Sequence, residues 1–122
     1  MKQEKKTVVL GASTNPERYS YLVVKRLAEN NAPVIAVGIK KGNIHGIEIQ
    51  NGTPQVEEVD TVTLYLGAEN QKQYYDYILG LKPKRIIFNP GAENPELEEM
   101  AEKNGIEVLE ACTLTMLSIG NF

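Results

Sequence analysis

The segment from Gly11 to Ser20 contains the residue types that bind phosphate groups. It reads Gly-Ala-Ser-Thr-Asn-Pro-Glu-Arg-Tyr-Ser and follows a short apolar run, Thr7 to Leu10. We expect it to join a buried strand to a helix, so that backbone N–H groups and the positive end of the helix dipole face a bound anion. The initial glycine lets the chain turn tightly and lets an anion approach the backbone. The segment therefore predicts a phosphate-binding loop.

Side chains of this loop add further contacts. Ser13 and Thr14 offer hydroxyl groups, and the Arg18 guanidinium can form a forked pair of hydrogen bonds with phosphate oxygens. The alternative is an ordinary polar loop, since Gly, Ser, Asn and Pro are common turn residues. Loops between a strand and a helix usually span about 2–6 residues, and the greater length here favours phosphate binding. The predicted ligand-binding residues of the loop are Gly11, Ala12, Ser13, Thr14, Asn15, Arg18 and Ser20.

The end of the second predicted strand indicates which nucleotide is bound. The loop lacks the G-x-G-x-x-G fingerprint of dinucleotide-binding proteins, because Ser13 stands in place of the second glycine. NAD enzymes place an acidic residue after the second strand, where it binds the ribose. This chain has Lys40 and Lys41 there, and a lysine attracts a phosphorylated ribose. The two lysines favour either coenzyme A, with its 3′-phosphate, or NADP, with its 2′-phosphate; the alternative is a solvated loop.

No catalytic set of residues is recognisable, and we expect no enzymatic activity. His45 is the only histidine and has no cysteine or second histidine at metal-ligand spacing, so we also expect no metal site. Glu96, Glu98 and Glu99 resemble paired carboxylates, but they lie at a predicted helix start, where acidic residues interact favourably with the helix dipole. The tyrosines at 74, 75 and 77 are interpreted as packing residues. The turn Asn89-Pro90-Gly91 either supplies backbone groups to the ligand or only shapes the chain.

The elements that must position these residues alternate between strands and helices. Strand-length apolar runs are Thr7–Leu10, Val34–Val37, Asp60–Leu66, Arg85–Phe88 and Ile106–Leu109. Helical patterns cover residues 21–30, 71–79 and the stretch after Asn94, and residues 113–119 form a last helix or a docked strand. Residues 40–54 are predicted as a loop with a short extended piece at 47–49.

This alternation predicts one Rossmann-like three-layer α/β/α domain over residues 1–122. Its doubly wound parallel sheet has about five strands in the order 3-2-1-4-5. Ligands of such sheets bind at the carboxyl ends of the strands, where the winding direction reverses. The loop after the first strand and the lysines after the second would meet at that edge.

Composition limits the classes of partner. The chain has 122 residues, of which 42% are hydrophobic and 24% charged, as in ordinary globular domains. Its net charge of -3 argues against nucleic acids, and its apolar runs are too short to span a membrane. The charged N-terminus shows no signal-peptide pattern, and a single cysteine fits a reducing compartment. We expect a cytoplasmic protein; no protein partner is indicated.

The segment Gly11 to Tyr21, Gly-Ala-Ser-x-Asn-Pro-Glu-Arg-x-Ser-Tyr followed by a hydrophobic helix, resembles the CoA-binding domain family. The resemblance runs from Val8 to about Met116. The family includes small stand-alone bacterial proteins and the N-terminal domain of the succinyl-CoA ligase α subunit. It implies that the adenosine and phosphate part of coenzyme A is bound by Gly11, Ser13, Asn15 and Arg18 and, more loosely, by Lys40 and Lys41.

The chain departs from the family pattern at two turns. Gly38-Ile39 stands where many members have Asn-Pro, and Asn89-Pro90-Gly91 replaces a turn that commonly contains glutamine. These departures concern the adenine pocket and the path of the pantetheine arm.

Cys112 follows the fifth predicted strand and is interpreted as a buried structural cysteine. An alternative hypothesis is that it forms a mixed disulfide with coenzyme A under oxidation.

Three functions follow from these observations. The one we favour is a module that binds coenzyme A or an acyl-CoA without catalysis. The second is an NADP-dependent oxidoreductase, which would need a substrate domain and a proton donor. The third is an interaction domain that binds no small ligand. A panel of nucleotide cofactors distinguishes the three.

Overall fold

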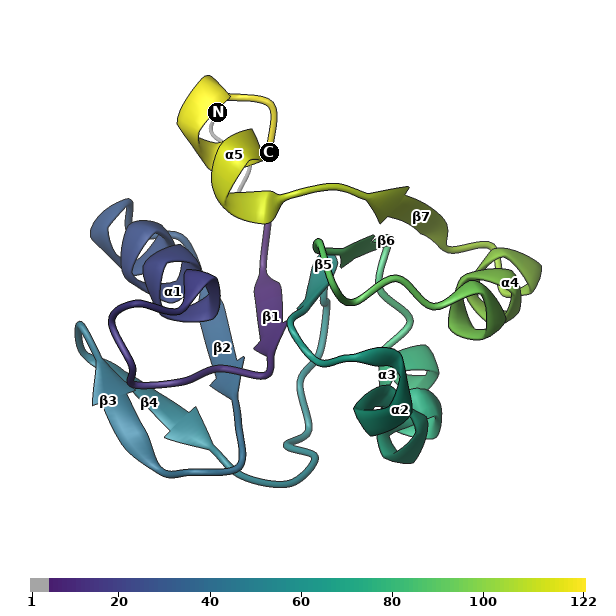
Figure 1. Ribbon diagram of the computed structural model, residues 1–122, viewed down its shortest axis with the longest axis horizontal. Coiled ribbons are helices and arrows are strands. Elements are labelled where there is room, and N and C mark those ends of the chain that lie inside the picture. The colour runs from purple at the N-terminus through teal and green to yellow at the C-terminus, as the bar shows by residue number, and fades with distance from the viewer. Residues whose placement is uncertain (1–4) are drawn as a thin grey trace.

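The computed structural model describes residues 5–122, in which one sheet lies between two layers of helices (Figure 1). The charged N-terminal stretch considered above as evidence against a signal peptide falls largely on residues 1–4, outside the described residues. The strands are β1 (Thr7–Leu10), β2 (Val34–Val37), β3 (Gly42–Ile44), β4 (Ile47–Gln50), β5 (Thr61–Leu64), β6 (Arg85–Phe88) and β7 (Glu107–Glu110). The helices are α1 (Tyr19–Glu29), α2 (Ala68–Gln71), α3 (Tyr75–Gly80), α4 (Pro95–Lys103) and α5 (Thr113–Ile119), with a 3₁₀ turn (Lys72–Tyr74) between α2 and α3.

The sheet confirms the predicted doubly wound α/β class but not the predicted strand count or order. Its described strands lie in the order β3-β4-β2-β1-β5-β6-β7, and every neighbouring pair is parallel except β3 with β4. The third predicted strand, β5, pairs with β1 and does not lie outside β2. That outer position belongs to β4, which pairs in parallel with β2. The order 3-2-1-4-5 was wrong because β4 lies in a segment predicted mainly as loop.

The hairpin β3–β4 has a weak sequence signal because only one of its faces is buried. Ile44 and Ile49 are buried, whereas Glu48 between them is exposed. This alternation is typical of a strand near a sheet edge, but the run is short. His45 and Gly46 form the connecting turn with positive φ angles of 51° and 90°, as tight hairpins require. If β4 is counted as the third strand, the strands β4-β2-β1-β5-β6 follow the order 3-2-1-4-5.

Two apolar cores hold the helices against the two faces of the sheet. Successive residues of a strand point to opposite faces, so Val8 and Val9 of β1 belong to different cores. Val9 packs in the core that contains Leu27 of α1, with side chains of α5 at its border. Val8 packs in the core that contains Ile78 of α3 and Leu97 of α4. The first and last helices therefore cover one face, and α3 and α4 cover the other.

Helix boundaries follow local chemistry closely. The Asn94 side chain accepts the N–H of Leu97 at 3.2 Å and caps α4, with Pro95 next to it and acidic residues in the first turn. The predicted helix over 71–79 is divided into α2, the 3₁₀ turn and α3. The tail forms the helix α5, which settles the choice between a helix and a docked strand. No helix within residues 5–122 has the length and apolar character needed to cross a membrane.

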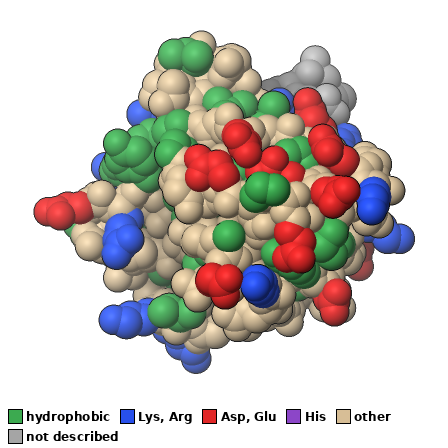
Figure 2. Space-filling view, turned by 45° about the vertical axis from the view of Figure 1, so that its right-hand side comes forward, with side chains coloured by type: hydrophobic (Ala, Val, Ile, Leu, Met, Phe, Trp, Pro, Cys, Tyr) green, Lys and Arg blue, Asp and Glu red, His purple; other side chains and the backbone are tan. Residues whose placement is uncertain are grey.

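Acidic side chains gather on the face that Figure 2 shows. The exposed glutamates of α4, of the segment before it and of β7 are Glu93, Glu96, Glu99, Glu102, Glu107 and Glu110. Much of the negative charge behind the net charge of -3 is therefore carried by the side of the molecule around α4 and β7.

Candidate functional site

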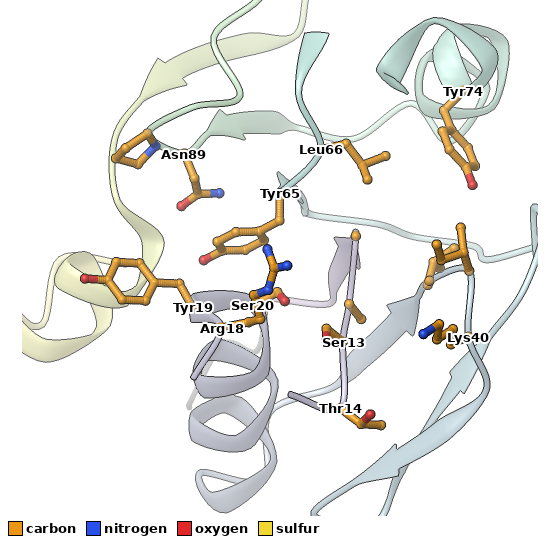
Figure 3. Close-up of a pocket in the computed structure, with 16 residues that line it drawn as sticks. Ser13, Thr14, Arg18, Tyr19, Ser20, Lys40, Tyr65, Leu66, Tyr74 and Asn89 are labelled. Carbon is orange, nitrogen blue, oxygen red and sulfur yellow. The ribbon is translucent and has the colours of Figure 1, made fainter. Parts of the chain in front are cut away.

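A pocket of about 550 Å³ opens at the carboxyl ends of β1, β2, β5 and β6 (Figure 3). This volume lies in the range of about 300–1,000 Å³ that is usual for small-molecule sites. It is lined by Gly11, Ala12, Ser13, Thr14, Arg18, Tyr19, Ser20, Val37, Gly38, Ile39, Lys40, Tyr65, Leu66, Tyr74, Asn89 and Pro90. The winding of the sheet reverses here, since α1 follows β1 on one face and α2 and α3 follow β5 toward the other. The pocket thus lies where the sequence predicted a site.

Most of the predicted binding residues meet in this pocket. Gly11, Ala12, Ser13, Thr14, Arg18, Ser20 and Lys40 line it, whereas Asn15 and Lys41 do not. The Asn15 side chain shapes the loop, because its Oδ1 accepts the N–H of Glu17 at 3.0 Å. Lys41 is exposed and directly precedes β3. A role in ligand binding stays a prediction for all of these residues.

The loop after β1 presents unpaired backbone donors. The N–H groups of Gly11 and Ala12 donate to the Val37 carbonyl at 2.8 and 2.9 Å, which ties the loop to the end of β2. The next two N–H groups, of Ser13 and Thr14, find no acceptor within the described residues. Both residues line the pocket. Backbone donors that stay unpaired must be satisfied by water or a ligand.

The N-terminus of α1 has no side-chain cap and is open to a ligand, whereas the N-terminus of α4 is capped. Arg18, the N-cap residue of α1, makes no side-chain capping hydrogen bond, and the first turn contains no acidic residue. The N-terminus of α4 has both an Asn94 cap and acidic residues. An open helix N-terminus carries unpaired donors and about half a positive charge. Tyr19 and Ser20, the first residues of α1, line the pocket, so this helix end is suited to an anion.

The charged side chains of the pocket wall are both cationic. Arg18 projects from the start of α1, and Lys40 lies beyond the end of β2 (Figure 3). The residues that line the pocket include no aspartate or glutamate. A cleft lined by one sign of charge concentrates ligands of the other sign, whatever the net charge of the molecule.

The part of the pocket wall that follows β5, and the part from the turn before α3, were not predicted from the sequence. Tyr65 and Leu66 were assigned to the third strand, and Tyr74 was interpreted only as a packing residue. The strand ends at Leu64, so the next two side chains reach the pocket. Tyr74 both borders the apolar core and lines the pocket. The available signal was position, because residues that directly follow an apolar strand lie at the edge where ligands bind.

Gly38 lets the end of β2 touch the loop after β1. A Cβ atom at this position would lie 2.4 Å from the Ala12 carbonyl oxygen and 3.2 Å from Cγ2 of Ile49. Gly42, at the start of β3, is similarly close to the Thr14 side chain. The hairpin therefore packs directly against the predicted phosphate loop.

Asn89 holds the strand ends together. Its Nδ2 donates to the Thr63 hydroxyl at 2.7 Å and to the Leu64 carbonyl at 2.9 Å, and its Oδ1 accepts the N–H of Thr113 at 2.8 Å. The N–H of Gly91 donates to a Glu93 carboxylate at 2.9 Å. The side chain and this N–H of the turn after β6 are thus already paired, which favours the turn-shaping interpretation of Asn89-Pro90-Gly91.

Cys112 and His45 lie outside the pocket wall. Cys112 is the N-cap residue of α5 and is half-buried, not fully buried as expected. His45 is exposed at the turn of the β3–β4 hairpin. Within residues 5–122, no three His, Cys, Asp or Glu side chains are arranged to hold a metal ion.

Nearly the whole chain is similar to known proteins, both in a family model and in solved structures. The family model described as CoA binding domain matches residues 5–118. The crystal structure of an uncharacterized protein is 53% identical, with a TM-score of 0.94, covering 99% of this chain and 100% of that one. The structure of cell-free ID.343 from Thermus thermophilus is 25% identical, with a TM-score of 0.83, covering 98% and 92%. A hypothetical protein from Pyrococcus horikoshii OT3, 22% identical with a TM-score of 0.84 and coverage of 96% and 84%, shares the fold. No curated protein matches the chain.

Proposed function

This chain belongs to the CoA binding domain family, and from that premise we propose that it binds coenzyme A or an acyl-CoA without catalysing a reaction. The ligand occupies the pocket at the carboxyl edge of the sheet. The observation that carries the proposal is the open N-terminus of α1 beside the unpaired N–H groups of Ser13 and Thr14. Together they form a concave set of donors of the kind that binds a diphosphate.

The two cationic side chains of the pocket, those of Arg18 and Lys40, pair with the negatively charged phosphate groups of the ligand. Arg18 stands at the helix end that receives the diphosphate, where its guanidinium pairs with phosphate oxygens. Lys40 contributes an ammonium group from beyond β2 and pairs with the 3′-phosphate on the ribose. Leu66 and Tyr74 supply apolar surface on the same side, and Ile39 precedes Lys40 in the pocket wall; the adenine ring packs against this surface.

Binding without catalysis is supported by the chemistry of the pocket wall. Its residues offer amides, hydroxyls, a guanidinium and an ammonium group, all of which bind phosphate. Imidazole and carboxylate groups, the usual general acids and bases of enzymes, are not among the residues that line the pocket in the described structure.

The proposal is tested by titration calorimetry with coenzyme A, acetyl-CoA, dephospho-CoA, NADP, NAD and ATP. We expect coenzyme A and acetyl-CoA to bind, and dephospho-CoA to bind more weakly. A thermal-shift assay gives a second readout, because a ligand at 100 times its dissociation constant adds about 2.7 kcal/mol to the free energy of unfolding. Binding of NADP alone would support the oxidoreductase alternative, and no response to any ligand would support an interaction domain.

A further inference from the structure

The hydroxyl group of Tyr65 is buried without a hydrogen-bond partner among the described residues. Tyr65 directly follows β5, and its ring forms part of the pocket wall. Buried polar side-chain atoms in native proteins are nearly always paired. Leaving a hydroxyl unpaired costs about 1–3 kcal/mol. An unpaired group of this kind at a pocket points to a ligand.

The polar groups around Tyr65 are engaged with one another. Asn89 uses both hydrogens of its amide and its carbonyl oxygen within the protein. The hydroxyls of Thr63 and Thr113 form a hydrogen bond of 2.7 Å. Burial raises the pKa of Tyr65, and the nearby hydroxyls of Thr113 and Thr63 offset only part of the rise, so the Tyr65 hydroxyl keeps its proton and remains a donor.

The position of Tyr65 assigns it to one end of an elongated ligand. In Figure 3, Tyr19, Tyr65 and Asn89 lie on one side of the pocket, and Lys40, Leu66 and Tyr74 lie on the other. The proposed function places the phosphorylated nucleoside on the side of Lys40. The part of the ligand beyond the diphosphate, an arm with two amide groups, must then leave on the side of Tyr65.

We infer that the Tyr65 hydroxyl donates a hydrogen bond to a carbonyl of this amide-containing arm and so selects the complete coenzyme over its nucleotide part. The inference rests on the proposed function. The hydroxyl points toward Tyr19 (Figure 3), whose side chain is 56% exposed. Because the hydroxyl has almost no exposed surface, side chains around it must move before the arm can reach it.

The test compares coenzyme A with adenosine 3′,5′-bisphosphate, which keeps the phosphorylated nucleoside and lacks both the arm and the outer phosphate of the diphosphate. Tyr65→Phe removes only the hydroxyl. We expect the affinity of this variant for coenzyme A to fall about fivefold to tenfold, the equivalent of one hydrogen bond. Its affinity for adenosine 3′,5′-bisphosphate should be unchanged. The melting temperature of the unliganded variant should equal or exceed that of the wild type, because an unpaired buried group is removed.

Tyr74→Phe is the matched control, since Tyr74 lines the opposite side of the same pocket. This variant should affect both ligands to the same extent. The inference is overturned if Tyr65→Phe binds coenzyme A as the wild type does, or if it weakens both ligands equally. Failure of the wild-type protein to bind either ligand would overturn the proposed function itself, which is a distinguishable result.

Discussion

Lys40 and Lys41 are adjacent and both exposed, but only Lys40 lines the pocket. The pair therefore separates a specific contact from a general effect of positive charge. We expect Lys40→Ala to lower the affinity for coenzyme A about tenfold, at the low end of the range for a hydrogen bond to a charged group, because the site is open to water. Titration calorimetry at physiological salt measures the change.

Lys41→Ala removes the same charge and should change the affinity less than about twofold, as is common for exposed charges away from a contact. Dephospho-CoA adds a second control, because it lacks the 3′-phosphate that Lys40 is proposed to bind. Its affinity should be almost the same for the wild type and Lys40→Ala. Equal losses in the two lysine variants would contradict a specific role for Lys40.

Single residues also show what sequence can and cannot predict. Arg18 and Lys40 were predicted from their chemistry and do line the pocket. Asn15 was predicted on the same grounds, but its side chain accepts the Glu17 N–H. Asparagine both shapes turns and binds ligands, so residue type alone cannot separate these roles. Tyr65 had no motif at all, because the role proposed for it depends on neighbours from β5, from the turn after β6 and from the start of α5.

At the scale of elements, the contact between the end of β2 and the loop after β1 positions the site. Gly38→Ala would force a methyl group to within 2.4 Å of the Ala12 carbonyl oxygen. Because backbone atoms must shift to relieve this contact, we expect a loss of about 1–3 kcal/mol in the free energy of unfolding. Affinity for coenzyme A should fall as well, since the loop is displaced. Urea denaturation and calorimetry measure the two effects.

Gly80→Ala is the control for this variant. A Cβ atom at Gly80 meets no other atom within 4 Å, and the residue ends α3, away from the pocket. Alanine is favoured over glycine in helices by up to about 1 kcal/mol, so this variant should be as stable as the wild type or slightly more stable. Coenzyme A should bind to it normally. Wild-type stability and affinity in Gly38→Ala would show that the β2–loop contact is not needed.

The predictability of each element depended on how many of its faces are buried. The strands β1, β5 and β6 are buried throughout, so continuous apolar runs revealed them. The hairpin β3–β4 buries one face and contains polar residues at alternate positions, which in a short segment looks like a loop. Missing β4 led directly to the wrong strand order. A pocket still lies at the predicted edge of the sheet, because its position depends on β1 and the reversal of winding.

At the scale of the whole molecule, the distribution of charge and the topology of the sheet both favour the same edge of the sheet as the site for an anion. Exposed glutamates surround α4, whereas Arg18 and Lys40 line the pocket. The helix whose N-terminus meets the pocket is uncapped, and the helix on the acidic side is capped. This distribution of charge favours the proposed anionic ligand at the edge of the sheet where the winding reverses, despite the net charge of -3.

The most direct test of this account is a crystal structure of the protein with coenzyme A. It should show diphosphate oxygens within about 2.7–3.2 Å of backbone nitrogens of the loop after β1 or of the first turn of α1, with the Arg18 guanidinium beside them. A nucleotide bound elsewhere, with the Ser13 and Thr14 N–H groups bonded only to water or to the protein's own side chains, would contradict the central claim.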